Sequence, residues 1–297
     1  MLKPVILTKQ SCGASVLRFL LYSLLSCCFV ISLLTSVSSN AQPSADKGKQ
    51  ASSTPLRIAV AANFTPVLKV LLEDFRKQTG IKTQIISGAS GAIFLQIKHG
   101  APYDIFLSAD SRRPKQLEQA GFTLKNSRKT YAIGQLALYS ATKNSLEPLS
   151  LEQLPLNLLK SPPARLAIAN PDIAPYGKAA KEALNHMGLW QAYQNRLIKG
   201  INIGQTFAQV RSKAVSSGIV ANSQLVINNL SGVLIPTSYH QAIEQQLIII
   251  RASKQQVAAK KLSDYLLSAK SQATIVSYGY AAMTLTNNSE LMIDHEF

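Results

Sequence analysis

Four short loops of small or polar residues each join an apolar run to a helical pattern, and such loops can bind an anion. The first unpaired N–H groups of a helix, together with the positive end of its dipole, form a ready anion site. Asn63 or Thr65 can cap the helix that follows the first loop, and Pro66 suits its first position. The four loops span residues 61–66, 87–91, 170–177 and 201–205.

Taken singly, each loop is more often a plain helix cap than a ligand site. Four of them at strand ends favour a shared site, because open α/β sheets bind ligands where their strands end. The only cationic side chain beside them is Lys178. Neutral donors can hold a desolvated dianion, since charge-assisted hydrogen bonds are about twice as strong as neutral ones. Donors alone offer no acceptor for a ligand's proton, which favours a fully deprotonated tetrahedral oxyanion.

The elements that position these loops alternate between short apolar runs and amphipathic segments, a pattern typical of an α/β fold. The helix over residues 66–79 has its apolar residues on one face and ends at Gly80, a left-handed cap. The other predicted helices span 92–99, 178–187, 205–215 and 255–269, and the predicted strands span 56–61, 82–86, 105–108, 136–140, 166–169, 219–221 and 247–251.

Two of these strands bracket about a hundred residues that carry strands and helices of their own. If the strands at 136–140 and 247–251 both cross between lobes, the chain forms two lobes around a cleft that can close over a ligand. We therefore expect lobe 1 to comprise residues 56–135 and 252–290. Lobe 2 then comprises 136–251 with the crossover strands, and 291–297 form a tail.

The first forty residues predict export. Lys3, Lys9 and Arg18 precede an apolar run over residues 19–34, and small residues follow near Ala41, which is the layout of a secretory signal peptide over residues 1–41. A retained membrane anchor is the alternative, because the run is near the lower limit for a membrane span. Residues 42–55 are polar and aperiodic and predict a flexible linker. All three cysteines lie in the leader, so the mature chain would have none.

Composition indicates a folded protein with a strongly basic balance. The 297 residues are 46% hydrophobic, and 31 Lys+Arg against 15 Asp+Glu give a formal charge of +16. Such a balance could reflect nucleic acid, an anionic surface or an anionic ligand. The basic residues are scattered singly rather than gathered into stripes, so we expect no nucleic-acid partner.

At the same loops the sequence resembles the periplasmic molybdate-binding proteins of molybdate ABC importers. The most specific segment is Tyr-Asp-Ile-Phe-Leu-Ser-Ala-Asp over residues 103–110, and weaker matching segments in the same order span much of the chain from residue 57 to residue 280. The resemblance implies a two-lobed type II periplasmic-binding fold, in which each lobe is a mixed sheet flanked by helices and two crossover strands join the lobes. It also implies a periplasmic protein that captures molybdate or tungstate and delivers it to a membrane permease with its ATPase.

Carried over position by position, the resemblance implies ligand donors from both lobes. Asn63 and Ser90 would donate from the first lobe, and Tyr176 and Ile203 from the second. Many relatives place a tyrosine where this sequence has Ala221, and Tyr176 is the substitute here. No residue would ligate the metal directly, since it is bound as an oxyanion, and we expect a monomer that needs no cofactor.

Other readings of the same residues are a binding protein for sulfate, phosphate or an organic anion, and a serine hydrolase. Ser90 stands in a segment that imitates a nucleophile elbow, but Ala92 occupies a position where that motif needs glycine. The four histidines show no metal or triad spacing. Asp104 and Asp110 flank an apolar strand and are expected to be caps or turn formers rather than catalysts. We therefore expect a binding protein and not an enzyme.

Overall fold

The computed structural model describes residues 54–141 and 165–283. The predicted signal peptide, most of the predicted linker and the predicted tail lie outside the described residues. Within the described residues, no helix is long and apolar enough to cross a membrane.

The first lobe is built on a five-stranded mixed sheet in the order β2-β1-β3-β10-β4. β1 pairs in parallel with β2 and β3, whereas β10 runs antiparallel to β3 and β4. β1 is buried along nearly its whole length, as expected of a strand that is apolar except for Arg57 and is covered on both faces. The strands are β1 (Leu56–Ala61), β2 (Thr83–Gly88), β3 (Ile105–Leu107), β4 (Lys129–Gly134) and β10 (Ile243–Ile249).

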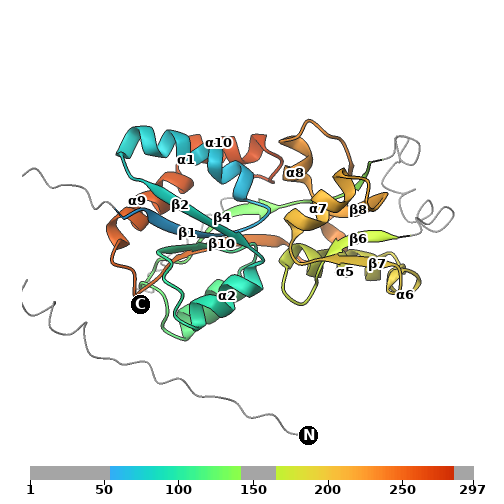
Figure 1. The fold of residues 1–297 in the computed structure, drawn as a ribbon, viewed down its shortest axis with the longest axis horizontal. Helices are drawn as coiled ribbons and strands as arrows, with labels where there is room; N and C mark the ends of the chain where they lie inside the picture. Colours follow the sequence, from blue (N-terminus) through green and yellow to red (C-terminus); the bar gives the residue numbers. More distant parts are fainter. Residues whose placement is uncertain (1–53, 142–164, 284–297) are drawn as a thin grey trace, which may run out of the picture. The chain divides into compact units, whose positions relative to one another are not determined.

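Helices cover both faces of this sheet (Figure 1). The apolar side of α1 packs with α9, α10 and one face of the sheet, and Ile93, Ile97 and Leu117 of α2 and α3 pack on the other. α1 ends where Gly80 adopts a positive φ of 68° and its N–H bonds to Arg76 O, as predicted. The helices are α1 (Thr65–Thr79), α2 (Ser90–Lys98), α3 (Arg112–Gln119), α9 (Gln256–Leu267) and α10 (Ala269–Ser277).

The second lobe repeats this arrangement with the sheet order β7-β6-β8-β5-β9. β6 is parallel to β7 and β8, and β5 is antiparallel to β8 and β9. α5 packs on one face and α7 on the other. The elements are β5 (Leu136–Ser140), β6 (Leu166–Ala169), α5 (Pro175–His186), α6 (Trp190–Tyr193), β7 (Leu197–Gly200), α7 (Ile203–Arg211), β8 (Ser217–Ala221), α8 (Asn222–Val226), β9 (Val233–Leu234) and a 3-10 turn, η1 (Thr237–Tyr239).

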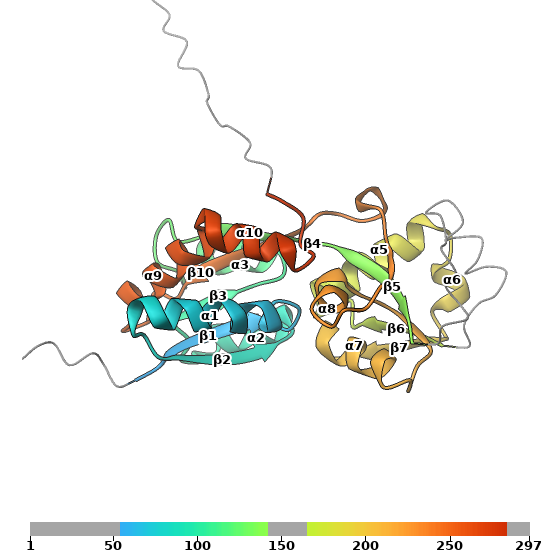
Figure 2. The ribbon, with the colours of Figure 1, turned by 90° about the horizontal axis from the view of Figure 1, so that it is seen from above.

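The chain passes between the two sheets twice within the described residues, as Figure 2 also shows. The first crossing joins β4 to β5 through Gln135, and the second runs from β9 to β10. The predicted boundary is corrected here. β10 pairs with β3 and β4 in the first sheet, whereas the predicted boundary assigns its residues to lobe 2 as part of 136–251. The crossing therefore comes before that strand, because β10 already has its hydrogen-bonding partners in lobe 1.

Candidate anion-binding site

Two pairs of adjacent parallel strands bring the four predicted loops together. β1 and β2 end side by side with Ala61 opposite Gly88, and β6 and β7 end with Ala169 opposite Gly200. Each pair is tied by a similar hydrogen bond just beyond the strand end, from Ala62 N to Gly88 O (3.0 Å) and from Asn170 N to Gly200 O (2.8 Å). Since the carboxyl ends of parallel strands meet at one edge of a sheet, each lobe presents two loops and two helix starts at one edge.

A cavity lies where these loops face one another, with about 200 Å³ of free space including its open mouth. Because much of that space belongs to the open mouth, the enclosed part is small and suits a small ion rather than a large organic ligand. The lobes also touch here, because Gly91 N, next to Ser90, donates to Ile173 O (2.9 Å). The cavity is lined by Ala61, Ala62, Asn63, Gly88, Ala89, Ser90, Ala109, Ala174, Pro175, Tyr176, Asn202 and Ile203. The structure thus brings together all four residues singled out from the sequence.

Six residues that line this cavity have a main-chain N–H group without a hydrogen-bond partner among the described residues, and the four predicted residues are among them: Asn63, Ala89, Ser90, Tyr176, Asn202 and Ile203. Ser90, Tyr176 and Ile203 lie in the first turns of α2, α5 and α7, where a helix cannot supply its own acceptors. The positive ends of three helix dipoles therefore accompany unpaired donors at one small cavity.

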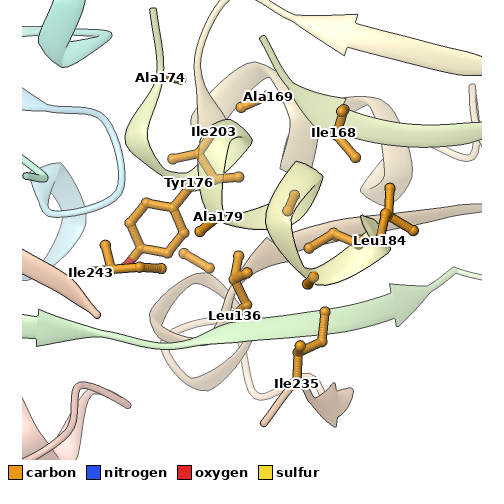
Figure 3. Packing of buried hydrophobic residues seen from close by; sticks show 14 of the residues in the cluster. Leu136, Ile168, Ala169, Ala174, Tyr176, Ala179, Leu184, Ile203, Ile235 and Ile243 are labelled. Carbon is orange, nitrogen blue, oxygen red and sulfur yellow. The ribbon is translucent and has the colours of Figure 1, made fainter. Parts of the chain in front are cut away.

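Two hydroxyl groups add to this set. Ser90 Oγ accepts a hydrogen bond from Ala109 N (2.9 Å), and Tyr176 Oη accepts one from Gln245 Nε2 (3.2 Å). In the described part of the chain neither hydroxyl hydrogen has an acceptor, and both residues line the cavity. Figure 3 shows the Tyr176 ring beside Ile203, with its oxygen toward Ile243.

Burial keeps the Tyr176 hydroxyl protonated. The side chain is 1% exposed, and its pKa is raised well above the ordinary value of 10, first by burial and then by the neighbouring Tyr280. A phenol with a raised pKa is a neutral donor throughout the physiological range. It therefore adds a hydrogen bond to the site without adding charge.

No residue lining the cavity carries a charge. Lys178 is turned away, since its ammonium pairs with Glu182 (3.4 Å) and donates to Gln241 Oε1 (3.1 Å). The buried Arg113 forms an ion pair with Asp110, which neutralises it. An anion in the cavity would therefore meet amide and hydroxyl dipoles only.

Asp104 does not line the cavity, and its role is structural. Its carboxylate accepts from Arg57 N (2.7 Å), Ser253 Oγ (2.6 Å) and Gln255 Nε2 (3.2 Å). It thereby ties β1 to the segment that leads into α9. Asp110 likewise accepts from the N–H of Arg113 (3.1 Å), at the start of α3. Both residues act as caps or clamps here, in line with their positions beside an apolar strand.

The suggested capping roles of Asn63 and Thr65 are wrong. The N-cap of α1 is Phe64, which makes no side-chain capping bond. Asn63 instead turns into the interior, where its Nδ2 donates to Gln245 Oε1 (2.9 Å) and Tyr280 Oη (3.1 Å). Its Oδ1 is buried without a partner within the described chain. This loop is closed over by β10 and the residues after α10, so the Asn63 side chain finds its partners there and not at the start of α1.

Ser90 lacks the partners of a catalytic nucleophile. Within the described residues, its hydroxyl contacts the main chain of Ala109 and makes no hydrogen bond to a histidine. A serine nucleophile needs a general base within hydrogen-bond reach. The geometry at Ser90 favours a binding group.

Gln245 and Tyr131, which lie directly behind the cavity, were missed from the sequence. Gln245 is fully buried in β10, and Tyr131 Oη donates to its Oε1 (3.0 Å). The available signal was the polar pair Gln245 and Gln246 placed just before a run of apolar residues. The predicted strand begins only at Leu247, whereas β10 begins at Ile243 and includes both glutamines.

Known proteins share both this sequence and this architecture. The sequence matches the family described as bacterial extracellular solute-binding protein over residues 56–281. The molybdate-binding protein ModA of Azotobacter vinelandii is 37% identical over 234 residues, covering 77% of this chain and 91% of that protein. The protein of the same name from Rhodobacter capsulatus is 33% identical over 223 residues, covering 75% and 86%.

A solved structure agrees with the sequence matches. The Azotobacter vinelandii periplasmic molybdate-binding protein superposes with a TM-score of 0.71 at 35% identity, over 77% of this chain and 100% of that one. The expected two-lobed periplasmic-binding fold is thereby confirmed. With its paired sheets, its two crossings and a match that spans nearly all of the described residues, this chain belongs to the bacterial extracellular solute-binding proteins.

Proposed function

We propose that this protein binds molybdate, or the similar oxyanion tungstate, in the cavity between its lobes and delivers it to an ABC importer. The observation that carries the proposal is the set of uncharged donors: the unpaired N–H groups of the four predicted residues and two hydroxyl groups around one small cavity without a charged lining residue. The relatives that share most of the chain's length are molybdate-binding proteins, which favours this oxyanion over others.

Neutral donors suit a dianion because each bond to it is charge-assisted. Such bonds are roughly twice as strong as neutral ones, and a buried site with few competing waters strengthens them further. Three of the four N–H groups, those of Ser90, Tyr176 and Ile203, are also fixed by their helices, so they need no reordering when the ion arrives. Asn63, Ser90, Tyr176 and Ile203 are the residues to which we assign these donors.

Delivery requires export and a membrane partner. We infer that residues 1–41 are removed as a signal peptide and that the mature protein works in the periplasm as a monomer without a cofactor. A permease with its ATPase then receives the ion. Mass spectrometry of the exported protein should place its N-terminus near Gln42. An N-terminus at Met1 in membrane-bound protein would instead show a retained anchor.

Calorimetry and thermal unfolding test the ligand directly. Molybdate and tungstate should each titrate at one site per chain, and ligand at about a hundred times its Kd should stabilise the folded protein by about 2.7 kcal/mol. Sulfate and phosphate at the same concentration serve as controls and should give smaller effects. Saturation by sulfate or phosphate with no response to molybdate would overturn the assignment.

A further inference from the structure

Gln245 connects the ligand groups of the two lobes, although it does not line the cavity. Its side chain is fully buried on β10 in the first lobe. Its Oε1 accepts from Asn63 Nδ2 (2.9 Å) and from Tyr131 Oη (3.0 Å), both in the first lobe. Its Nε2 donates to Tyr176 Oη (3.2 Å), which belongs to the second lobe and also accepts a longer bond from Asn63 Nδ2 (3.5 Å).

These contacts fix which way the amide of Gln245 faces. Asn63 Nδ2 donates to its oxygen, so its N–H₂ group faces Tyr176; the single hydroxyl hydrogen of Tyr131 is shared between this oxygen and Ser108 O (3.1 Å). A hydroxyl oxygen that accepts from an amide on one side directs its own hydrogen elsewhere. The Tyr176 hydrogen has no other acceptor within the described chain, and Tyr176 lines the cavity. The hydrogen of Tyr176 is therefore free to point to the ligand.

We infer that Gln245 is a positioning residue for anion binding, which orients the Tyr176 hydroxyl so that its hydrogen faces the cavity. This inference rests on the proposed function and deepens it. Gln245 touches no ligand itself. It acts through Tyr176, and because the two residues come from different lobes, the donor is correctly oriented only where the lobes meet.

Gly134 makes room for this contact at the first crossing. A Cβ atom added to Gly134 would lie 2.9 Å from Tyr176 Cζ and 3.0 Å from Gln245 Nε2, and closer still to the Tyr176 oxygen. Contacts below 3.0 Å are essentially never made by real Cβ atoms. The tyrosine thus reaches Gln245 across a position where the chain carries no side chain.

A double-mutant cycle between Gln245→Met and Tyr176→Phe tests this role, with molybdate affinity measured by calorimetry. Methionine keeps the length of the side chain and makes no strong hydrogen bond. Tyr176→Phe should weaken binding by about 10- to 100-fold, and Gln245→Met by about 3- to 10-fold. In the Tyr176→Phe background Gln245→Met should weaken it by less than about twofold, because no hydroxyl is left to orient and Asn63 keeps its bond to Tyr280.

A purely structural role would give a different cycle. Gln245→Met would then lower affinity by the same factor in both backgrounds, which would overturn the inference. The matched control is Gln246→Met, the next residue of β10, whose side chain bonds to Thr130 and Glu244 away from the cavity. This control should leave molybdate affinity unchanged, and a loss equal to that of Gln245→Met would also overturn the inference.

A second variant keeps the test open if Gln245→Met does not fold. Gln245→Glu preserves side-chain volume and the acceptor for Asn63 and Tyr131, but it replaces the donor toward Tyr176 with an oxygen that accepts the tyrosine's hydrogen. It should weaken binding more in the Tyr176 protein than in the Tyr176→Phe background. Equal losses would refute the orienting role. Wild-type protein that binds no molybdate would instead refute the proposed function, so the two failures are distinct.

Discussion

Replacing Gly134 with alanine adds one methyl group where the second lobe's tyrosine approaches the first crossing. The new atom would lie 2.9 Å from Tyr176 Cζ and 3.0 Å from Gln245 Nε2. Both neighbours are buried, with Tyr176 1% and Gln245 0% exposed, so neither can swing into solvent to make room. The contact is between lobes, because Gly134 ends β4 and Tyr176 belongs to α5.

The expected cost follows from the size of this overlap. Adding a methyl group to a packed interior typically costs about 1–3 kcal/mol. If the lobes must meet to hold the anion, that cost falls on the bound state, while the free protein can relieve it by separating them. Since 1.4 kcal/mol is tenfold in affinity, Gly134→Ala should weaken molybdate binding by about 5- to 150-fold. The melting temperature without ligand should change little.

Calorimetry of the variant with molybdate, and thermal unfolding without it, separate these effects. Gly218→Ala is the matched control, because its methyl group would lie 2.7 Å from Val210 Cγ2 and 2.8 Å from Ala167 O, all within the second lobe. That variant should melt at a lower temperature and bind with nearly wild-type affinity while folded. Wild-type affinity for Gly134→Ala would refute the reasoning, because the Tyr176 contact could not then belong to the bound state.

Three further predictions concern individual donors and buried phenols. Ser90→Ala should weaken molybdate binding by about 10- to 100-fold in calorimetry, because one hydrogen bond to a charged group is lost. The control Ser263→Ala, in α9, should leave the affinity unchanged. Equal affinities of the two variants would show that the Ser90 hydroxyl does not bind the anion. Ile203→Pro removes one N–H group at the first position of α7, where proline is tolerated, and should weaken binding about as much. The control Ile203→Val keeps this N–H group and should keep the affinity. Unchanged binding by the proline variant would show that the Ile203 N–H group is not a donor to the anion. Burial raises the pKa of Tyr131 and Tyr176 above 10. Above that pH the unfolded chain loses a proton from each tyrosine that the folded protein keeps, so unfolding releases these protons. The free energy of unfolding should therefore fall by about 1.4 kcal/mol per pH unit per tyrosine as pH rises above 10. Tyr131→Phe should reduce that slope by one proton in urea unfolding at alkaline pH, and an unchanged slope would contradict the linkage.

The strands whose ends the sequence predicts best are those that are mostly apolar and buried on both faces. β1, β5 and β6 begin and end where the sequence predicted, because central strands of a covered sheet are buried on both faces. α1 was equally clear, since its apolar face is regular and Gly80 ends it.

Elements with a polar composition were missed. α3 is strongly hydrophilic and buries few side chains, among them Leu117, so its sequence shows no apolar periodicity. β4 and β7 mix exposed and buried positions without clear alternation, and β4 lies at the edge of its sheet. Whether these segments form strands depends on the neighbouring strands with which they pair, and a local sequence pattern carries no information about those neighbours.

Some residues of the site could be predicted from the sequence and others could not. Loops that run from a strand into a helix can be recognised locally, and all four residues chosen from them line one cavity. The groups behind it could not be found in this way, because Gln245 and Tyr131 become partners of Asn63 only when distant strands pair. The place of Asn63 itself was misread for the same reason. Its side chain follows the burial of the loop and not the preference of asparagine for helix caps.

Four of the six donors assigned to the anion belong to the peptide backbone, which every amino acid except proline carries. Ala62, Ala89 and Ile203, which line the cavity with side chains that carry no donor, should therefore accept replacements of similar size without losing recognition. In a saturation library selected for oxyanion uptake, tolerance at these positions would be limited by bulk and by proline rather than by chemical character. Such a site is specified more by the path of the main chain than by the identity of its residues.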